Sequence, residues 1–492
     1  MKTRYKLLLM SLLGISIFSG CDDFLKCEPE SSYSVVGAYK TAADFEQASA
    51  GIYGKLQGLY AGNTSFLYAM NMRTDELNVV TPGNPSGYLG GLERFTNDAL
   101  NGSTESWLNN FFGVISRTNQ ILDKIDNGIF TDETQRDCIK GESYFFRAYS
   151  YWYLGHLFGG MPLYERSYSV EETKLIPRST QDETFDFAEK DFKSAISLLP
   201  EQWSGDNNGR PTKYVAAAML ARMCMFRHQY AKAKPYLEDV INSKVYEMET
   251  QYVDCVNESG EYGKERMFEI QFMGGQLGEG QHFTPGCLPA EYRGDLQICN
   301  GFNSYPLVST TLLAAYEPGD LRKDISVATN LMINGTVDDQ NTYIIKFHHT
   351  AIKPVNQNDW GVNIPIIRYT DVKLMYAEVL NELNGVNDTS IAILKEVRNR
   401  AGLSTPTTFN TKEDFLKALI KERQVEFAFE GLRWSDLLRW GIAKKVMNDF
   451  LGDIKQDGGI YVMEDYQCIF PIPSSLLNTY ANEKVMWQNP VY

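Results

Sequence analysis

The sequence predicts a mostly α-helical protein, in which tetratricopeptide-like helical repeats carry an irregular, loop-rich ligand-binding region. Two observations lead to this fold class. Apolar residues recur at the helical period in two blocks of the chain. Between the blocks, from about residue 246 to residue 364, Gly, Asn and Pro are frequent and the period is lost. We therefore expect an N-terminal part over 21–245 and a C-terminal part over 246–492.

The first block predicts a series of paired helices. Residues 107–125 place apolar side chains largely on one helical face, and a second helix over 131–158 ends before a Gly-Gly-Met-Pro turn. Further helices are expected over 180–199, 212–228 and 231–243. Paired helices of this size, joined by short turns, are typical of tetratricopeptide units of about 34 residues.

Helices return in the second block. Apolar residues over 372–383 fall at i, i+3, i+4, i+7, i+8 and i+11, which is the stripe expected of a helix that packs on a core. Residues 391–401 and 412–440 are also predicted to be helical, with Gly431 between two halves of the last helix.

Residues 1–20 are predicted to be a lipoprotein signal peptide. Basic residues precede an apolar stretch from Leu7 to Phe18, which is shorter than the about 20 residues that span a bilayer. Two small residues then precede Cys21, as in a bacterial lipobox, so we expect Cys21 to be lipidated. An ordinary signal peptide with an incidental cysteine is the alternative. Stable anchoring needs more than one acyl chain, which a triacylated cysteine provides.

Charge and cysteine usage exclude several classes of protein. The chain has 62 acidic and 47 basic residues, a net charge of −15, so a nucleic-acid partner is not expected. Of the eight cysteines, seven remain when Cys21 is set aside, and no Cys-x-x-Cys pair occurs. This pattern supports neither a zinc site nor a dense disulfide framework. A Cys287–Cys299 bridge and buried free thiols both remain open.

Several segments in order resemble the SusD/RagB family of nutrient-uptake outer-membrane lipoproteins. They are GESYFFRAYSYWYLGHLFGGMPLYE (141–165), RYTDVKLMYAEVLNELN (368–384), LKEVRNRAGL (394–403), ERQVEFAFEGLRWSDLLRWG (422–441), IFPIP (469–473) and QNPVY (488–492). Val491 stands where the family usually has glycine. Together with the lipobox, the matches extend from Cys21 to the C-terminus.

The resemblance implies a SusD-like α-α superhelix of four tetratricopeptide-like units with a loop-rich region packed on it. It also implies a protein at the outer membrane, anchored only by its lipid and exposed on the cell surface, where Asp22 and Asp23 would favour export. Its implied partner is a SusC-like TonB-dependent transporter. Polysaccharide utilization would be its role.

No motif predicts catalysis. Glu426 and Glu430 stand four residues apart, and glycosidases use two carboxylates about 5–10 Å apart. However, basic residues alternate with these acids, which favours a structural ion-pair network. His348 and His349 are a poor metal pair because neighbours on a strand face opposite ways. We expect no cofactor, and the acidic turn Asp338-Asp339 is interpreted as a solvated loop, with calcium binding as the alternative.

A glycan ligand would need aromatic faces for the C–H side of each sugar ring and a few fixed polar groups. Residues 62–95 and 274–295 have no helical period and are predicted to be long loops, which are often functional. The ligand-binding residues predicted there and in neighbouring loops are Trp360, Tyr88, Asp75, Tyr292, Phe95, Phe302, Asn71 and Arg94.

The sequence therefore predicts a non-catalytic cell-surface receptor for an oligo- or polysaccharide. The first alternative is the same role for a peptide or another non-glycan nutrient. A lipid-anchored glycoside hydrolase is disfavoured by the missing acid and base, and a purely structural repeat scaffold is the remaining hypothesis.

Overall fold

The structure is a computed structural model that describes residues 39–62, 65–80, 88–288, 305–333, 335–348, 352, 354–356, 358–453, 460–480 and 482–492. The predicted signal peptide and the lipidation site Cys21 lie outside these residues. Within the described part, no helix combines the length and the apolar character needed to cross a membrane. The prediction of a mostly α-helical protein is confirmed.

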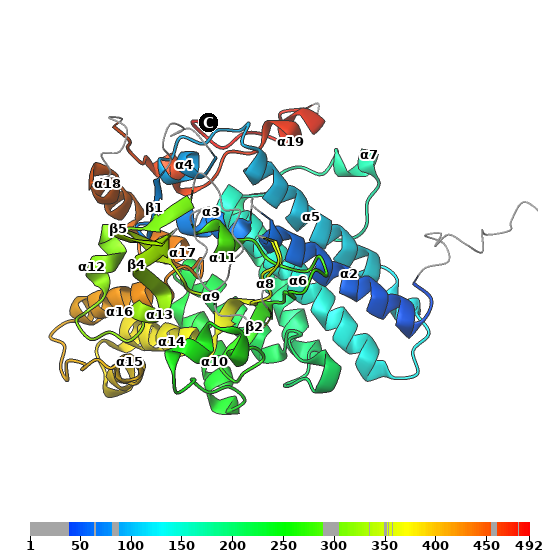
Figure 1. The fold of residues 1–492 in the computed structure, drawn as a ribbon. Helices are drawn as coiled ribbons and strands as arrows, with labels where there is room; N and C mark the ends of the chain where they lie inside the picture. Colours follow the sequence, from blue (N-terminus) through cyan, green and yellow to red (C-terminus); the bar gives the residue numbers. More distant parts are fainter. Residues whose placement is uncertain are drawn as a thin grey trace, which may run out of the picture.

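Long helices form a curved array in which each packs against the next along the chain (Figure 1). Helices α2, α5 and α6 run side by side, α8 and α9 follow, and α10 joins this group to α14, which contacts α15 and α16. Their bounds are α2 Ala42–Ala61, α5 Gly102–Leu122, α6 Glu133–Phe158, α8 Gln181–Leu198, α9 Lys213–Phe226, α10 Tyr230–Ser243, α14 Tyr369–Asn384, α15 Asp388–Arg400 and α16 Lys412–Glu426. Each helix predicted before residue 245 is present, within a few residues at its ends.

Local sequence explains where these helices begin. Thr41 and Asp44 form a reciprocal capping box at the start of α2, and Thr180 and Glu183 form another at the start of α8. Such caps satisfy backbone N–H groups that have no partner inside the helix. Most of the helices then bury their apolar faces in one large core, which draws residues from both predicted parts of the chain, and α15 and α16 pack on α14 around a second, smaller core.

The predicted helix over 412–440 is divided at Gly431, as expected, but its first half is shorter than predicted, because α16 ends at Glu426 and α17 spans Arg433–Arg439. A tight turn separates them, with φ of 67° at Phe429 and 75° at Gly431. At Gly431 a Cβ atom would lie 3.1 Å from both Leu67 and Met70, so the turn packs directly on the short helix α3 (Phe66–Met72). Glu426 and Glu430 therefore do not share one helix.

Three two-stranded antiparallel sheets lie among the shorter elements of the described chain. Strand β1 (Leu77–Val80) pairs with β3 (Tyr305–Val308), β2 (Arg266–Ile270) with β6 (Ile364–Arg368), and β4 (Val327–Ile333) with β5 (Thr336–Ile344). The remaining short helices are α3 Phe66–Met72, α4 Tyr88–Glu93, α7 Val170–Thr173, α11 Phe283–Gly286, α12 Thr310–Ala315, α13 Lys323–Ser326, α18 Ala443–Asp453 and α19 Ser474–Thr479. Strands β2 and β6 are buried along their whole length, and β2 lies near α2.

Candidate functional site

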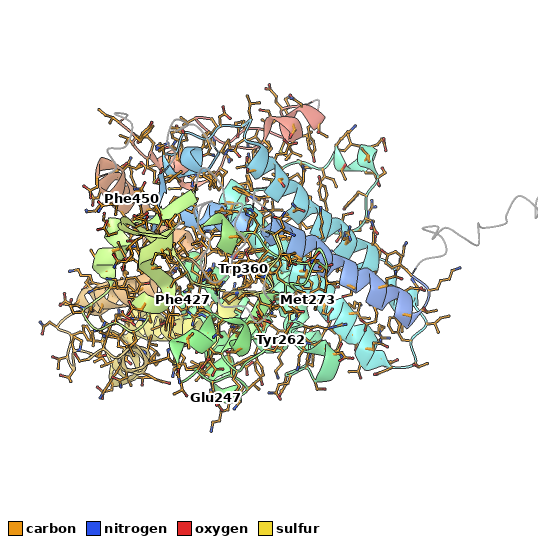
Figure 2. All side chains as sticks on the ribbon, viewed as in Figure 1. Glu247, Tyr262, Met273, Trp360, Phe427 and Phe450 are labelled. Carbon is orange, nitrogen blue, oxygen red and sulfur yellow. The ribbon has the colours of Figure 1, made fainter. Side chains whose placement is uncertain are left out.

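Trp360, predicted to offer an open face to a sugar, is buried with no exposed surface. Its indole N–H donates to the Phe347 carbonyl at 3.1 Å, and its ring stacks on His348 with 5.3 Å between the ring centroids. Figure 2 shows Trp360 within the body of the molecule. The prediction of an exposed stacking surface here is corrected: the segment around Trp360 folds inward to fill the core.

The polar residues predicted to hold sugar hydroxyls are also buried. Asp75 accepts two hydrogen bonds of 2.9 Å from Arg433. Asn71 donates to the Phe429 carbonyl and accepts from the Gly431 N–H, both at 3.0 Å. Both side chains therefore hold the turn between α16 and α17 in place and offer nothing to a ligand.

The same correction applies to Phe95 and Arg94, each 3% exposed. Phe95 lies against Trp434, with 5.9 Å between ring centroids. Residues 65–80 contain α3 and β1, so the predicted long loop over 62–95 is partly core structure. The prediction of an exposed loop failed because α3 is too short to show a helical period and is buried on every side. The absence of a period therefore does not imply exposure.

The remaining predicted ligand residues stay predictions. Tyr88 is the first residue of α4, but its side chain lies outside the described residues. Tyr292 and Phe302 fall wholly outside them.

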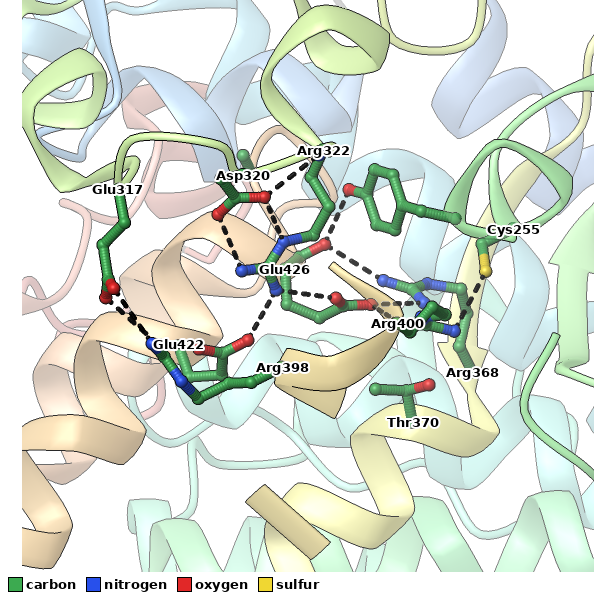
Figure 3. Close-up of polar contacts among 12 residues, drawn as sticks. Cys255, Glu317, Asp320, Arg322, Arg368, Thr370, Arg398, Arg400, Glu422 and Glu426 are labelled. Carbon is green, nitrogen blue, oxygen red and sulfur yellow. Dashed lines mark hydrogen bonds and ion pairs between the residues drawn. The ribbon is translucent and has the colours of Figure 1, made fainter. Parts of the chain in front are cut away.

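Glu426, one member of the candidate carboxylate pair, belongs to a buried ion network (Figure 3). Glu426 has no exposed surface and contacts the guanidinium groups of Arg368 at 3.0 Å, Arg400 at 2.6 Å and Arg322 at 3.1 Å. Burial alone would raise the pKa of Glu426, but Arg400 and Arg368 outweigh it and lower that pKa to about 2.

Glu430 accepts from Lys346 at 2.7 Å and from Arg368 at 2.8 Å. A general acid must hold a proton near neutral pH and reach the substrate, and the Glu426 carboxylate does neither. The structural interpretation of this pair is therefore confirmed.

The described residues include no group of three His, Cys, Asp or Glu side chains placed to hold a metal ion. At the acidic turn, the Asp338 carboxylate accepts from the Tyr343 hydroxyl at 2.6 Å and from the Asn341 amide at 2.9 Å. Cys287 is a buried free thiol. Cys299 and His349 lie outside the described residues.

A surface groove, which we call the α2–β2 groove, lies between α2, the turn over 206–210 and β2. One part has a volume of about 380 Å³ and is lined by both apolar and polar groups. A second part of about 160 Å³ shares Asn208, Arg210, Phe268 and Glu269 with the first. The side chains that matter most along the groove are Tyr53, Gln57, Trp203, Asn208, Tyr262 and Gln271.

Tyr262 is the most exposed aromatic side chain of the groove, at 49%. Its backbone has a φ of 59°, which non-glycine residues rarely adopt and which accumulates at functional sites. The Tyr262 N–H donates to the buried Glu269 carboxylate at 2.8 Å, and the neighbouring Glu261 carboxylate accepts from the Asn363 N–H at 2.6 Å. Two carboxylates thus fix the backbone that presents this ring.

Trp203 and Gly209 complete this end of the groove. Trp203 is half-buried, and its indole N–H donates to the Pro211 carbonyl at 2.9 Å. At Gly209, with a φ of 88°, a Cβ atom would lie 2.1 Å from the Gln271 amide nitrogen and 2.9 Å from the Tyr262 ring. A side chain at this position would displace the Gln271 amide and press on the Tyr262 ring, and the positive φ also favours glycine.

On the α2 side, the groove offers amide groups. The Gln57 amide donates to the Gln271 carbonyl at 3.0 Å, which links α2 to the end of β2. Aromatic side chains and amide groups along one open groove suit a ligand with both apolar faces and hydroxyl groups. Sequence reasoning missed this site, although Trp203 and Tyr262 stand in turn-rich segments that contain Gly and Asn.

The fold is that of a helical-repeat protein with an open surface groove. Residues 315–492 match the family model described as the SusD family, and residues 23–225 match one described as starch-binding, associating with the outer membrane. The chain is 27% identical to the SusD-like protein P25 of Formosa agariphila, covering 89% of this chain and 90% of that protein. Against SusD-like protein P2 of the same organism, identity is 25% over 99% of this chain and 100% of that protein.

Solved structures share the fold. The surface glycan-binding protein A from Bacteroides thetaiotaomicron in complex with laminarihexaose superposes with a TM-score of 0.77 at 19% identity, over 92% of this chain and 100% of that one. A SusD superfamily protein from Bacteroides vulgatus gives 0.72 at 24% identity, over 90% and 98%. This chain belongs to the SusD family. The predicted family and fold class are confirmed, and members of this family are binding proteins and not enzymes.

Proposed function

We propose that the protein binds a nutrient glycan at the cell surface without cleaving it, and passes it to a TonB-dependent outer-membrane transporter. The observation that carries this proposal is the α2–β2 groove, where Tyr262 and Trp203 line one part and the fixed Gln57 amide lines the other. Aromatic side chains can cover the C–H face of a sugar ring while amides bond its hydroxyls, with no cofactor needed.

The comparisons support this ligand class. One matching family model is described as starch-binding, and one structure with the same fold is a surface glycan-binding protein in complex with laminarihexaose. The buried state of Glu426 and Glu430 supports binding without cleavage, because neither carboxylate reaches the groove surface.

The anchor and the partner are part of the same proposal. Lipidation of Cys21 would tether the domain to the outer membrane, and the matching starch-binding family model begins at residue 23, two residues after that cysteine. A protein held at the membrane in this way would keep its ligand near a transporter. A TonB-dependent transporter is the partner that family membership suggests.

The test is affinity electrophoresis of the soluble form lacking residues 1–21 against a panel of polysaccharides, with reducing sugar assayed in parallel. We expect one or a few polysaccharides to retard the protein with no release of reducing sugar. Tyr262→Ala should weaken the binding about five- to thirtyfold, since loss of one stacked ring costs on the order of 1–2 kcal/mol.

Tyr168→Ala is the matched control, because Tyr168 is half-buried beside α7 and does not line the groove. Retardation that survives in Tyr262→Ala would remove the groove from the proposal. No retardation by any polysaccharide would refute glycan binding and favour a peptide or another non-glycan nutrient.

A further inference from the structure

We propose that the α2–β2 groove selects uncharged glycans and rejects glycans that carry carboxylate or sulfate groups. This inference rests on the proposed function and adds the class of glycan. Its basis is the state of every charged side chain that lines the groove: the cations are each paired within the protein, whereas two exposed carboxylates are not.

Arg210 is the cation at the centre of the groove, shared by both of its parts. Its guanidinium contacts Glu46 at 3.1 Å and Glu142 at 3.1 Å. Glu142 has no exposed surface. If Arg210 turned to an anionic ligand, the buried Glu142 carboxylate would lose its ionic partner, which is costly.

The other two cations are no more available. Arg266 is 4% exposed, contacts Glu269 at 3.0 Å and donates to the Cys255 carbonyl at 3.0 Å, so it faces the interior. Lys264 is exposed and pairs with Glu247 at 3.0 Å. An exposed pair can open, but any anion that reached Lys264 would then meet the freed Glu247 carboxylate.

Asp206 and Glu279 line the α2 side of the groove, and both are exposed. Within the described residues neither carboxylate forms an ion pair with a basic side chain. Carboxylates are good acceptors for sugar hydroxyls, so a neutral glycan gains from them. A polyanion would meet two like charges and no uncommitted cation, on a chain that already carries a net charge of −15.

The test begins with the neutral polysaccharide that retards the protein most. That polysaccharide is compared with its carboxymethylated derivative, and its hydroxyethylated derivative controls for the bulk of the added group. At low salt, we expect carboxymethylation to weaken binding at least about tenfold more than hydroxyethylation does. The reason is that the carboxylates of Asp206 and Glu279 would repel the added carboxymethyl groups. Added salt should reduce the difference in affinity between the two derivatives, because it screens this repulsion.

The double substitution Asp206→Lys with Glu279→Lys should reverse this preference and admit the carboxymethylated derivative. Glu483→Lys, an exposed charge change near the C-terminus, is the matched control and should leave the preference unaltered. The inference is overturned if the wild-type protein binds the carboxymethylated derivative as tightly as the hydroxyethylated one. It is also overturned if the double variant discriminates as the wild type does. If no polysaccharide binds at all, the proposed function itself fails, which is a distinct result.

Discussion

Lys346 allows the buried ion network to be tested with a closely matched control. Its ammonium group has no exposed surface and donates to Glu430 at 2.7 Å and to the Ala428 carbonyl at 2.8 Å. Lys346→Met keeps the length and apolar stem of the side chain but removes both hydrogen bonds. Arg368 still holds Glu430 at 2.8 Å, so that carboxylate is not left wholly unpaired.

The magnitude follows from the burial of the pair. Removing one partner of a buried ion pair costs about 3–5 kcal/mol, and the remaining contact with Arg368 places Lys346→Met near the lower end, at about 3 kcal/mol. Lys445→Met is the control, because Lys445 pairs with Asp449 at 2.5 Å on the exposed face of α18. An exposed pair four residues apart contributes only about 0.3–0.5 kcal/mol.

The assay is urea unfolding followed by both tryptophan fluorescence and circular dichroism, so that the two probes test whether the transition is cooperative. We expect Lys346→Met to lower the free energy of unfolding by several times the change in Lys445→Met. Combining Lys346→Met with Glu430→Gln should cost less than the sum of the two single changes, as expected of residues in contact. An equal decrease in the free energy of unfolding for Lys346→Met and Lys445→Met would refute the claim that the buried ion network stabilises the fold.

Three further results are expected. Arg400 and Arg368 lower the pKa of Glu426 to about 2, and Arg423 and Arg222 lower the pKa of Asp371 to about 2, although burial alone would raise both. The stability that these carboxylates contribute is therefore complete above about pH 4.5 and is lost as the pH falls toward 2, so Asp371→Asn should flatten the acid side of an unfolding-versus-pH curve. Gly209→Ala should weaken glycan binding at least about tenfold by displacing Gln271, whereas Gly205→Ala, where an added Cβ meets nothing within 4 Å, should not; equal affinities would contradict the role of the turn. Cys21→Ser should release the protein from the outer-membrane fraction of its native host, and continued retention would exclude lipid anchoring at this residue.

The helical framework could be predicted from the sequence because local patterns determine it. The apolar stripe over 372–383 and the capping residue Thr180 act within a few residues of the helix that they specify. The ion network was predicted from alternating charges near Glu426. Its actual partners, Arg322, Arg368 and Arg400, come from three other elements, and no spacing rule reveals contacts at that separation.

The candidate site could not be predicted in the same way. Trp360 was selected because it lies outside a helix, but burial depends on how distant segments pack over it. Conversely, Trp203 and Tyr262 stand 59 positions apart in the sequence and line one groove because the turn at Gly209 lies against the Tyr262 ring. An exposed aromatic residue is a property of the tertiary structure.

Gly54 permits the most direct test of the central claim, that the α2–β2 groove holds the ligand. Gly54 lines the groove, and an added Cβ there meets nothing within 4 Å, so Gly54→Trp would fill the groove from the surface of α2 without disturbing the core. Gly58 lies one turn further along α2, is equally open and does not line the groove. Both changes remove a helical glycine, so neither should destabilise the protein.

The measurement is isothermal titration calorimetry of the wild type, Gly54→Trp and Gly58→Trp with an oligosaccharide of the retained polysaccharide. We predict saturable binding by the wild type and by Gly58→Trp with similar affinity, and at least about a hundredfold weaker binding by Gly54→Trp. Undiminished binding by Gly54→Trp would contradict the claim and place the ligand elsewhere on the protein.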